Sequence, residues 1–292
     1  MYVKALITYL PGSIFLITFK HNNKMRNILI VVFLVSSLAN AQNISIENNV
    51  NIPKGWERVI QNDFHAWIIQ QPLSEDYVKT YDGKNVYGVN TIYKVKFDYD
   101  IGNEDLHHCA DAAIYLNALH KYDNEQYHRI TYHFTDGQVF GYIQYLAGYR
   151  PKVKQDGSVN IIYTHNQRKP SYKNFRMFLD IIWKYAGTWS VDEYDTYELK
   201  TGWAMPGDIF VKGGFPGHAI TVIDVIENID TGERKYMFSE SYMPAQDQYI
   251  VVNTAEHGIR PQLDLWFDID YNKPLSTSRW TFQPKDLKRF IK

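Results

Sequence analysis

The clearest pattern of apolar and polar positions lies in residues 169–188. Large apolar side chains recur there every three or four residues, at Phe175, Phe178, Leu179, Ile182 and Trp183. This spacing places them on one face of an α-helix, which Ser171 is expected to cap and Gly187 to end. Residues 62–73 and 105–122 show the same spacing and predict two further helices, with Asn62 as the cap of the first.

Strands are predicted where apolar and polar residues alternate between turn signals. Residues 91–102 and 127–134 show this pattern. Residues 206–241 predict two or three antiparallel strands, with Asp230-Thr231-Gly232 near a turn. The tail, residues 281–292, predicts a short amphipathic helix. Separate helices combined with antiparallel strands indicate an α+β fold.

The most apolar run of the chain lies near its start, at residues 28–38. It follows the short basic stretch Met25-Arg26-Asn27 and precedes Ala39-Asn40-Ala41, a small-x-small cleavage pattern. We therefore expect residues 1–41 to be a signal peptide whose true start is Met25; an uncleaved anchor is the alternative. Export to the periplasm, the extracellular space or the cell surface follows from this interpretation.

Removal of the signal peptide would change the charge of the chain. Residues 1–41 hold four basic residues and no acidic one, so the net charge of −1 would become −5. This balance argues against nucleic acid as a partner, and no later stretch is long and apolar enough to span a membrane. We divide the remainder into an N-terminal extension, 42–100, packed on a main domain, 101–292. The oligomeric state is left open.

Cys109 is the only cysteine of the chain, so no internal disulfide can form. In an oxidising compartment a single thiol is a liability unless it is buried or used. A helix that begins near His107 would place Cys109 in its first turn, where the helix dipole favours a thiolate, whereas capping by Asn103 would place it in the second. Cys109 is thus either a nucleophile or a small apolar core residue.

His218 begins a predicted strand after a glycine-rich loop and a Pro-Gly-Asp turn. A histidine that acts as a base needs a polar side chain on a neighbouring strand to orient it. Residues 239–241 read Ser-Glu-Ser, and strand alternation allows either Glu240 or the two serines to face the predicted helix. The alternative is a loop histidine whose nitrogens are satisfied by the backbone.

These features resemble the papain-like cell-wall peptidases and amidases of the NlpC and CHAP types. The resemblance rests on PGDIFVKGGFPGHAITVIDV and, more loosely, on HCADAAIYL. It implies a Cys-bearing helix packed on an antiparallel sheet, with Cys109 as nucleophile, His218 as general base and Glu240 or a neighbour as orienter. The Asp-Cys-Ser-Gly signature of those families is absent, and the separation between Cys109 and His218 is longer than is typical.

A second resemblance covers most of the chain after residue 41. HCADAAIYLNALHKY, GYRP, PSYKNFRMFLDIIWKYAGT, PGDIFVKGGFPGHAITVIDV and SESYMPAQD are similar to the domain-of-unknown-function 4846 family of exported bacterial proteins. That family implies no activity. The positions that lie inside its motifs are Cys109, Asp111, Arg150, Gly217, His218 and Gln246.

Four residues are candidates for substrate binding: Arg150, Ser241, Tyr242 and Gln246. Arg150 could grip a substrate carboxylate with its planar guanidinium, or could pair with a buried acid such as Asp111. Gln246 could donate to an oxyanion or a sugar hydroxyl, or could hold its own loop in place. Asp111 and Gly217 are assigned structural support.

A metal site is not expected, because His107, His108 and Cys109 are consecutive and point about 100° apart on a helix. No other cofactor is implied. The leading hypothesis is an exported cysteine hydrolase, a peptidase or amidase that acts on a peptide or a cell-wall fragment. The alternatives are a non-catalytic glycan- or peptide-binding envelope protein on the same fold, and a structural envelope protein whose Cys109 is buried and inert.

Overall fold

The structure is a computed structural model that describes residues 6–10, 14–21, 24–27, 44–88, 95–200, 202–257, 259 and 263–291. The chain divides into two compact units, Met1–Asn43 and Ile44–Lys292. The first contains β1 (Leu6–Leu10), β2 (Ile14–His21) and β3 (Lys24–Asn27), which pair antiparallel in that order. The predicted apolar core and cleavage site of the signal peptide lie outside the described residues. No helix among the described residues is long and apolar enough to cross a membrane.

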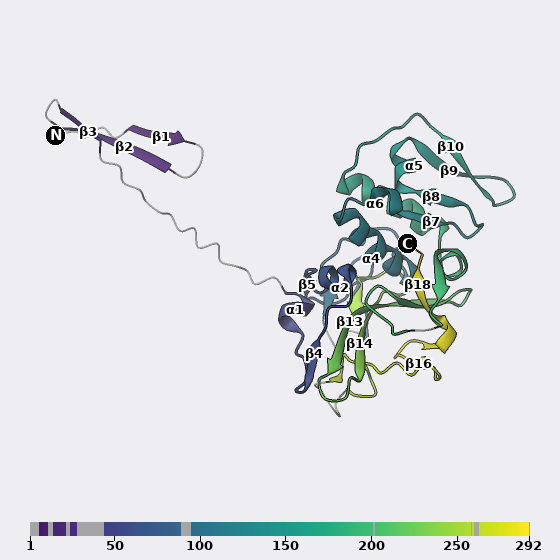
Figure 1. Ribbon diagram of the computed structural model, residues 1–292. Coiled ribbons are helices and arrows are strands. Elements are labelled where there is room, and N and C mark those ends of the chain that lie inside the picture. Colours follow the sequence, from purple (N-terminus) through teal and green to yellow (C-terminus); the bar gives the residue numbers. More distant parts are fainter. Residues whose placement is uncertain are drawn as a thin grey trace. The chain divides into compact units, whose positions relative to one another are not determined.

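An antiparallel sheet forms the centre of the unit Ile44–Lys292, so this unit has the predicted α+β class (Figure 1). The described residues contribute nine strands to it, eight of them in the order β11-β18-β12-β13-β14-β15-β6-β5, while β4 pairs with β13. The strands are β4 (Trp56–Arg58), β5 (Leu73–Ser74), β6 (Lys96–Phe97), β11 (Thr196–Glu198), β12 (Ile209–Lys212), β13 (His218–Asn228), β14 (Arg234–Glu240), β15 (Tyr249–Ile250) and β18 (Leu287–Phe290). The segment before residue 100 therefore supplies three strands of the same sheet.

Strand β13 is buried on both of its faces, which explains its nearly continuous run of apolar residues. Ala219 packs in one cluster with the helices, and Ile223 packs with segments from the N-terminal part of the unit. Ile220 and Val222 point to the opposite face, where they pack against aromatic rings of neighbouring strands. The sheet is consequently an inner layer of the fold.

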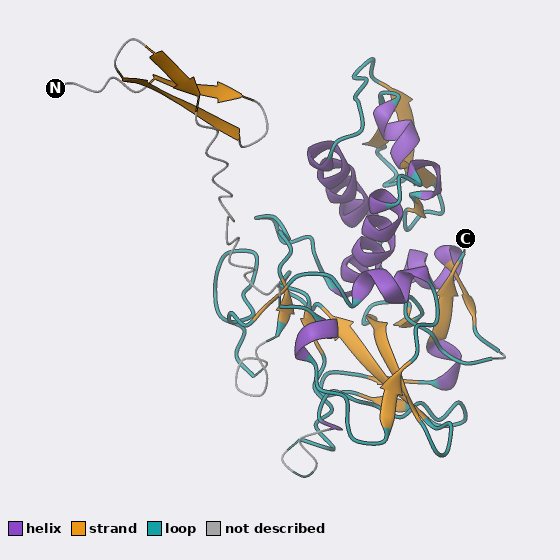
Figure 2. Ribbon diagram, turned by 60° about the vertical axis from the view of Figure 1, so that its left-hand side comes forward, coloured by secondary structure: helices purple, strands orange, loops and turns teal. Residues whose placement is uncertain are grey.

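The longest helices lie together on one side of this sheet (Figure 2). The two longest are α4 (Cys109–Asp123) and α6 (Tyr172–Tyr185), and both contribute to one apolar cluster. Short helices and turns complete the set: α1 (Ile46–Asn49), α2 (Asp63–Ile68), η1 (Tyr127–Arg129), α5 (Tyr142–Leu146), α7 (Thr188–Ser190), η2 (Val191–Asp195) and η4 (Pro284–Asp286). The remaining strands form three hairpin pairs: β7 (Thr131–His133) with β8 (Val139–Gly141), β9 (Tyr149–Val153) with β10 (Val159–Tyr163), and β16 (Leu275–Ser276) with β17 (Thr281–Phe282).

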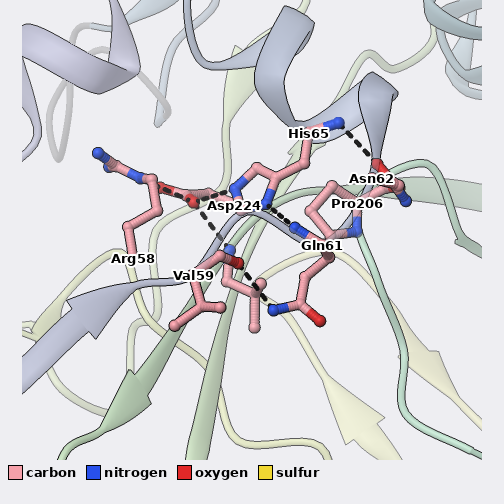
Figure 3. A network of polar contacts seen from close by, with 8 residues as sticks. Arg58, Val59, Gln61, Asn62, His65, Pro206 and Asp224 are labelled. Carbon is pink, nitrogen blue, oxygen red and sulfur yellow. Dashed lines mark hydrogen bonds and ion pairs between the residues drawn. The ribbon is translucent and has the colours of Figure 1, made fainter.

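A buried polar network fastens the N-terminal part of the unit to β13 (Figure 3). The Arg58 guanidinium donates from Nε and from one terminal nitrogen to the Asp224 carboxylate, at 2.8 to 3.0 Å. His65 Nε2 lies 2.7 Å from the same carboxylate, and His65 Nδ1 accepts a hydrogen bond from the backbone N–H of Gln61. Asp224 follows a β-bulge in β13, and its side chain is fully buried. This network therefore ties β4 and α2 to the middle of the sheet.

Most of the predicted elements are confirmed. Ser171 caps α6 and Asn62 caps α2, each by accepting a backbone hydrogen bond from the residue three positions on. The helix predicted at 105–122 is α4, and the strands predicted in 206–241 are β12, β13 and β14. The strand predicted at 127–134 is shorter, because a 3-10 turn, η1, precedes β7.

The prediction of an amphipathic helix at the C-terminal end is wrong. The residues there form β17, the 3-10 turn η4 and β18, and β18 lies between β11 and β12 in the sheet. Leu287 and Phe290 are both buried, and their spacing of three residues matches a helix as well as it matches this strand. In the folded molecule the segment is a strand, because β11 and β12 lie on its two sides and pair with its backbone groups.

Candidate active site

A cavity of about 630 Å³ opens where the start of α4 meets the start of β13. Its walls come from residues 108–111, from the segment 183–189, from the loop 214–218, and from Tyr242, Met243 and Trp280. Cys109 and His218 both line it. The structure therefore brings the two residues singled out in the sequence to one cavity, although they are far apart along the chain.

Cys109 is the first residue of α4. The backbone N–H of His108 donates to Asp111 Oδ2 at 3.0 Å, which holds the first turn of the helix. The pKa of the Cys109 thiol is raised to about 12, mainly by burial and also by the nearby Asp111 carboxyl, although backbone hydrogen bonds from Ala219 and Ala110 act in the opposite direction. The thiol is thus protonated at neutral pH and lies beside the first residues of β13.

The His218 imidazole is buried and held on several sides. Its Nε2 lies 2.8 Å from Glu240 Oε2, and its ring packs against those of Tyr242, Trp280 and Phe282. The other nitrogen, Nδ1, is buried and has no hydrogen-bond partner among the described residues. One nitrogen of the ring is therefore held by a carboxylate, while the other makes no hydrogen bond within the described part of the chain.

Glu240 is the residue of the Ser-Glu-Ser stretch that contacts His218. Its Oε1 accepts a hydrogen bond of 2.5 Å from the Tyr249 hydroxyl and lies 3.8 Å from Arg279 Nε. The carboxylate is fully buried, so these contacts fix its orientation. Ser239 accepts a hydrogen bond from Gln248 on the same sheet and does not contact His218.

Ser241 and Gln246 hold the loop after β14 against the start of α4. The Ser241 hydroxyl lies 2.9 Å from the backbone carbonyl of His107 and 2.7 Å from that of Gln246. The Asp105 carboxylate accepts a hydrogen bond from the backbone N–H of Ala245 at 2.7 Å. Neither Ser241 nor Gln246 lines the cavity, whereas Tyr242, which lies between them, does.

The glycines before His218 allow two loops to pack closely. A Cβ atom at Gly217 would collide with Thr188 Oγ1 and with the carbonyl oxygen of Gly214, and Thr188 Oγ1 itself donates to that carbonyl at 3.1 Å. A Cβ atom at Gly213 would collide with Asp192, whose carboxylate accepts the Gly213 N–H. These glycines are therefore required for contact between the loop 213–217 and residues 188–192.

Asp111 and Arg150 lie in different places. Asp111 lines the cavity, and burial raises the pKa of its carboxyl well above the usual value; its Oδ1 has no partner among the described residues. The Arg150 guanidinium donates to the backbone carbonyls of Tyr145, Tyr149 and Asn166 and stacks on the Tyr145 ring. Arg150 does not line the cavity. Its hydrogen bonds connect β9 to α5 and to the segment after β10.

Sequence reasoning did not single out several aromatic residues of the cavity wall: Trp183, Trp189, Phe215 and Trp280. The abundance of tyrosine and tryptophan was the available signal, but composition does not show which rings share a cavity. Within the part of the chain that the structure describes, no group of three His, Cys, Asp or Glu residues could hold a metal ion. His107, next to the site, is fully buried, and burial lowers its pKa to about 3, so it is neutral.

A family model described as "Domain of unknown function (4846)" matches residues 46–289 of the chain. The match includes α4, β13, β14 and every wall of the cavity. No curated protein and no solved structure matches the chain.

Proposed function

The chain belongs to the family described as Domain of unknown function (4846), and we propose that it is a cysteine hydrolase of papain-like architecture that cleaves an amide bond. One observation carries this proposal. Cys109 and His218 line the same cavity, and His218 has Nε2 held by Glu240 while Nδ1 has no hydrogen-bond partner among the residues that the structure describes. A nucleophile, a base and an orienting carboxylate are the three parts that covalent hydrolysis of this type requires.

In the proposed reaction, His218 Nδ1 takes the proton of the Cys109 thiol as the sulfur attacks the carbonyl carbon of the substrate. The new C–S bond forms as the carbonyl electrons move to oxygen. The backbone N–H of Cys109 has no partner within the helix, because it belongs to the first turn, and it can donate to this oxyanion. The imidazolium then protonates the leaving amine as the C–N bond breaks, which leaves a thioester.

Hydrolysis of the thioester completes the cycle. His218 Nδ1 takes a proton from water, the hydroxide oxygen bonds to the thioester carbon, and the proton returns to sulfur as the C–S bond breaks. The Glu240 carboxylate stabilises the imidazolium in both steps and keeps Nδ1 directed to the cavity. Because the pKa of the thiol is raised to about 12, the proton is transferred during attack, and no thiolate exists beforehand.

Export and the nature of the substrate are parts of the same proposal. The pattern of residues 25–41 supports a signal peptide, and the resemblance to cell-wall peptidases supports a peptide amide as the substrate. The site of action would be the periplasm or the cell surface.

The decisive experiment compares the wild type with Cys109→Ala and His218→Ala. Each protein is incubated with purified peptidoglycan and, separately, with a mixture of peptides, and the released amines are quantified by mass spectrometry. We expect release by the wild type alone. Trp203→Ala serves as the control, because Trp203 is exposed and does not line the cavity. Equal release by wild type and Cys109→Ala on both substrates would contradict the hydrolase.

The protonated, buried thiol favours one alternative, a binding module on the same fold. In that case Cys109→Ala would bind peptide or glycan as tightly as the wild type and neither protein would change it. Isothermal titration calorimetry with both proteins separates the two functions.

A further inference from the structure

Several large aromatic side chains line the cavity, among smaller residues such as alanine, glycine and threonine. Trp183, Trp189, Tyr242 and Trp280 line it, together with Phe215 at its opening. Phe215 is 97% exposed, Met243 is 56% exposed and Trp189 is 47% exposed, so these three large apolar side chains are open to solvent beside one cavity. Exposed apolar residues that gather at a cavity mark a binding site for an apolar group.

The charged groups around the cavity disfavour an anionic ligand. No Lys, Arg or Glu of the described residues lines it, and its ionisable lining residues are His108, Cys109, Asp111 and His218. Two guanidinium groups lie against rings of the wall: Arg279 lies 4.5 Å from the centre of the Tyr242 ring, and Arg176 lies 4.4 Å from that of Trp183. A substrate carboxylate in this cavity would lose its hydration and would lie near Asp111 without a lysine or arginine in the lining to pair with, which is unfavourable.

We propose that the cavity binds a peptide in which the residue on the acyl side of the scissile amide carries an uncharged aromatic side chain. This inference rests on the proposed function and narrows its substrate class: of the two substrates tested above it favours the peptide mixture over peptidoglycan, whose stem peptides carry no aromatic side chain. An aromatic side chain is favoured over an aliphatic chain because five aromatic side chains line the cavity, and ring–ring contacts contribute beyond the area that they bury. An acidic residue at the same position is rejected.

The test uses four N-acetyl-aminoacyl 4-nitroanilides that differ only in the side chain: Phe, Leu, Gln and Glu. Gln and Glu have nearly the same shape, so their comparison isolates the charge. We expect kcat/KM to fall in the order Phe, Leu, Gln, Glu, with Glu at least about tenfold below Gln. Cleavage of the Glu substrate at the rate of the Gln substrate would overturn the proposal. A dodecanoyl 4-nitroanilide that is cleaved faster than the Phe substrate would overturn it in favour of a lipid acyl chain.

A binding measurement separates this inference from the hydrolase. Cys109→Ala is titrated with N-acetyl-Phe-amide and with N-acetyl-Glu-amide, and tryptophan fluorescence is recorded, since three tryptophans line the cavity. Selective binding of the Phe compound without any hydrolysis by the wild type would contradict the proposed function and retain only the preference of the cavity for an uncharged aromatic side chain. Equal binding of both compounds, or binding of neither, would overturn the inference.

Substitutions in the wall complete the test. Trp189→Ala and Phe215→Ala should each lower the preference for Phe over Gln by several-fold, because each removes a ring from the opening. Met243→Lys adds a cation at the same opening and should raise kcat/KM for the Glu substrate relative to Gln. Trp203→Ala, an exposed tryptophan elsewhere, is the matched control and should change neither ratio. Thermal unfolding of each variant confirms that it is folded.

Discussion

At the scale of single residues, the site depends on how each ionisable side chain is placed. One nitrogen of His218 contacts Glu240 and the other has no hydrogen-bond partner in the described part of the chain, while the Cys109 thiol is buried and protonated. The helix dipole acts on Cys109, which is the first residue of α4, but burial has the larger effect on its pKa. This geometry therefore favours a mechanism in which His218 acts as a base and removes the proton of the Cys109 thiol.

We predict that alkylation of Cys109 by iodoacetamide is slow at pH 6 and rises with pH. Only the thiolate reacts, and a pKa of about 12 means that its population grows about tenfold for each pH unit between pH 7 and pH 10. Mass spectrometry of the intact protein after timed labelling measures the rate. The unfolded protein in denaturant, in which the thiol has its ordinary pKa, provides the reference.

The same labelling on His218→Ala shows whether the histidine alters the thiol. We expect the pH profile of this variant to match that of the wild type. A labelling rate of the wild type that stays high and constant below pH 7, and is lost in His218→Ala, would instead indicate a preformed thiolate–imidazolium pair.

At the scale of elements, the position of β13 is set by polar contacts as well as by apolar packing. The carboxylate of Asp224 receives Arg58 from β4 and His65 from α2, and all three side chains are largely buried. A buried carboxylate is tolerated in the interior only when it is paired and hydrogen-bonded. This network therefore specifies where the N-terminal part of the unit joins the sheet.

Arg58→Met should destabilise the protein strongly, because it leaves Asp224 buried without its cation. We expect a loss of about 3 kcal/mol in the free energy of unfolding, measured by urea denaturation. Lys273→Met is the control, because Lys273 pairs with Asp270 at the surface and its loss should cost less than about 1 kcal/mol. Similar losses in the two variants would show that the buried pair contributes no more than a surface pair.

At the scale of the whole molecule, titration of buried groups makes stability depend on pH. His107 is fully buried between Tyr115 and Trp183, and burial lowers its pKa from 6.5 to about 3. The unfolded chain binds a proton at His107 below pH 6.5 and the folded chain does not. The contribution of neutral His107 to stability is therefore present above pH 6.5 and is lost progressively as the pH falls toward 3.

His107→Phe should reduce the sensitivity of the protein to acid. This single proton accounts for a slope of about 1.4 kcal/mol per pH unit below pH 6, and Phe preserves the contacts between the rings while it removes the titration. Urea denaturation at pH 7, 6 and 5 measures the slope. His128→Gln is the control, since His128 is exposed; a slope unchanged in His107→Phe would contradict the assignment.

The elements that were predicted well are those whose signal is local. Ser171 and Asn62 cap helices through contacts with residues three positions away, so a short stretch of sequence contains the information. The glycine-rich loop and the strand at His218 were also predicted, because turn residues and apolar runs act over a few positions.

The errors and omissions involve residues that are distant in sequence. Residues 287–290 became a strand because β11 and β12 lie on either side of them, and no local pattern shows those neighbours. Trp189 and Trp280 were not recognised as neighbours of Cys109 and His218, since only the packing of separate loops brings them to one cavity. The contacts of Arg150 were not predicted either, because the backbone carbonyls of Tyr145 and Asn166 come close to its guanidinium only in the folded chain.

The sequence by itself determined the α+β class, the caps of the helices, the order of strands β12 to β14, and the choice of Cys109 and His218 as the residues to examine. The tertiary structure decided that Cys109 and His218 share a cavity, that Glu240 and not a serine holds the imidazole, and that aromatic side chains from separate segments line this cavity. The physical reason is the separation along the chain over which each kind of interaction acts. Capping, turns and periodicity act between near neighbours in the chain, whereas burial, pKa and the shape of a cavity depend on segments that meet only in the folded molecule.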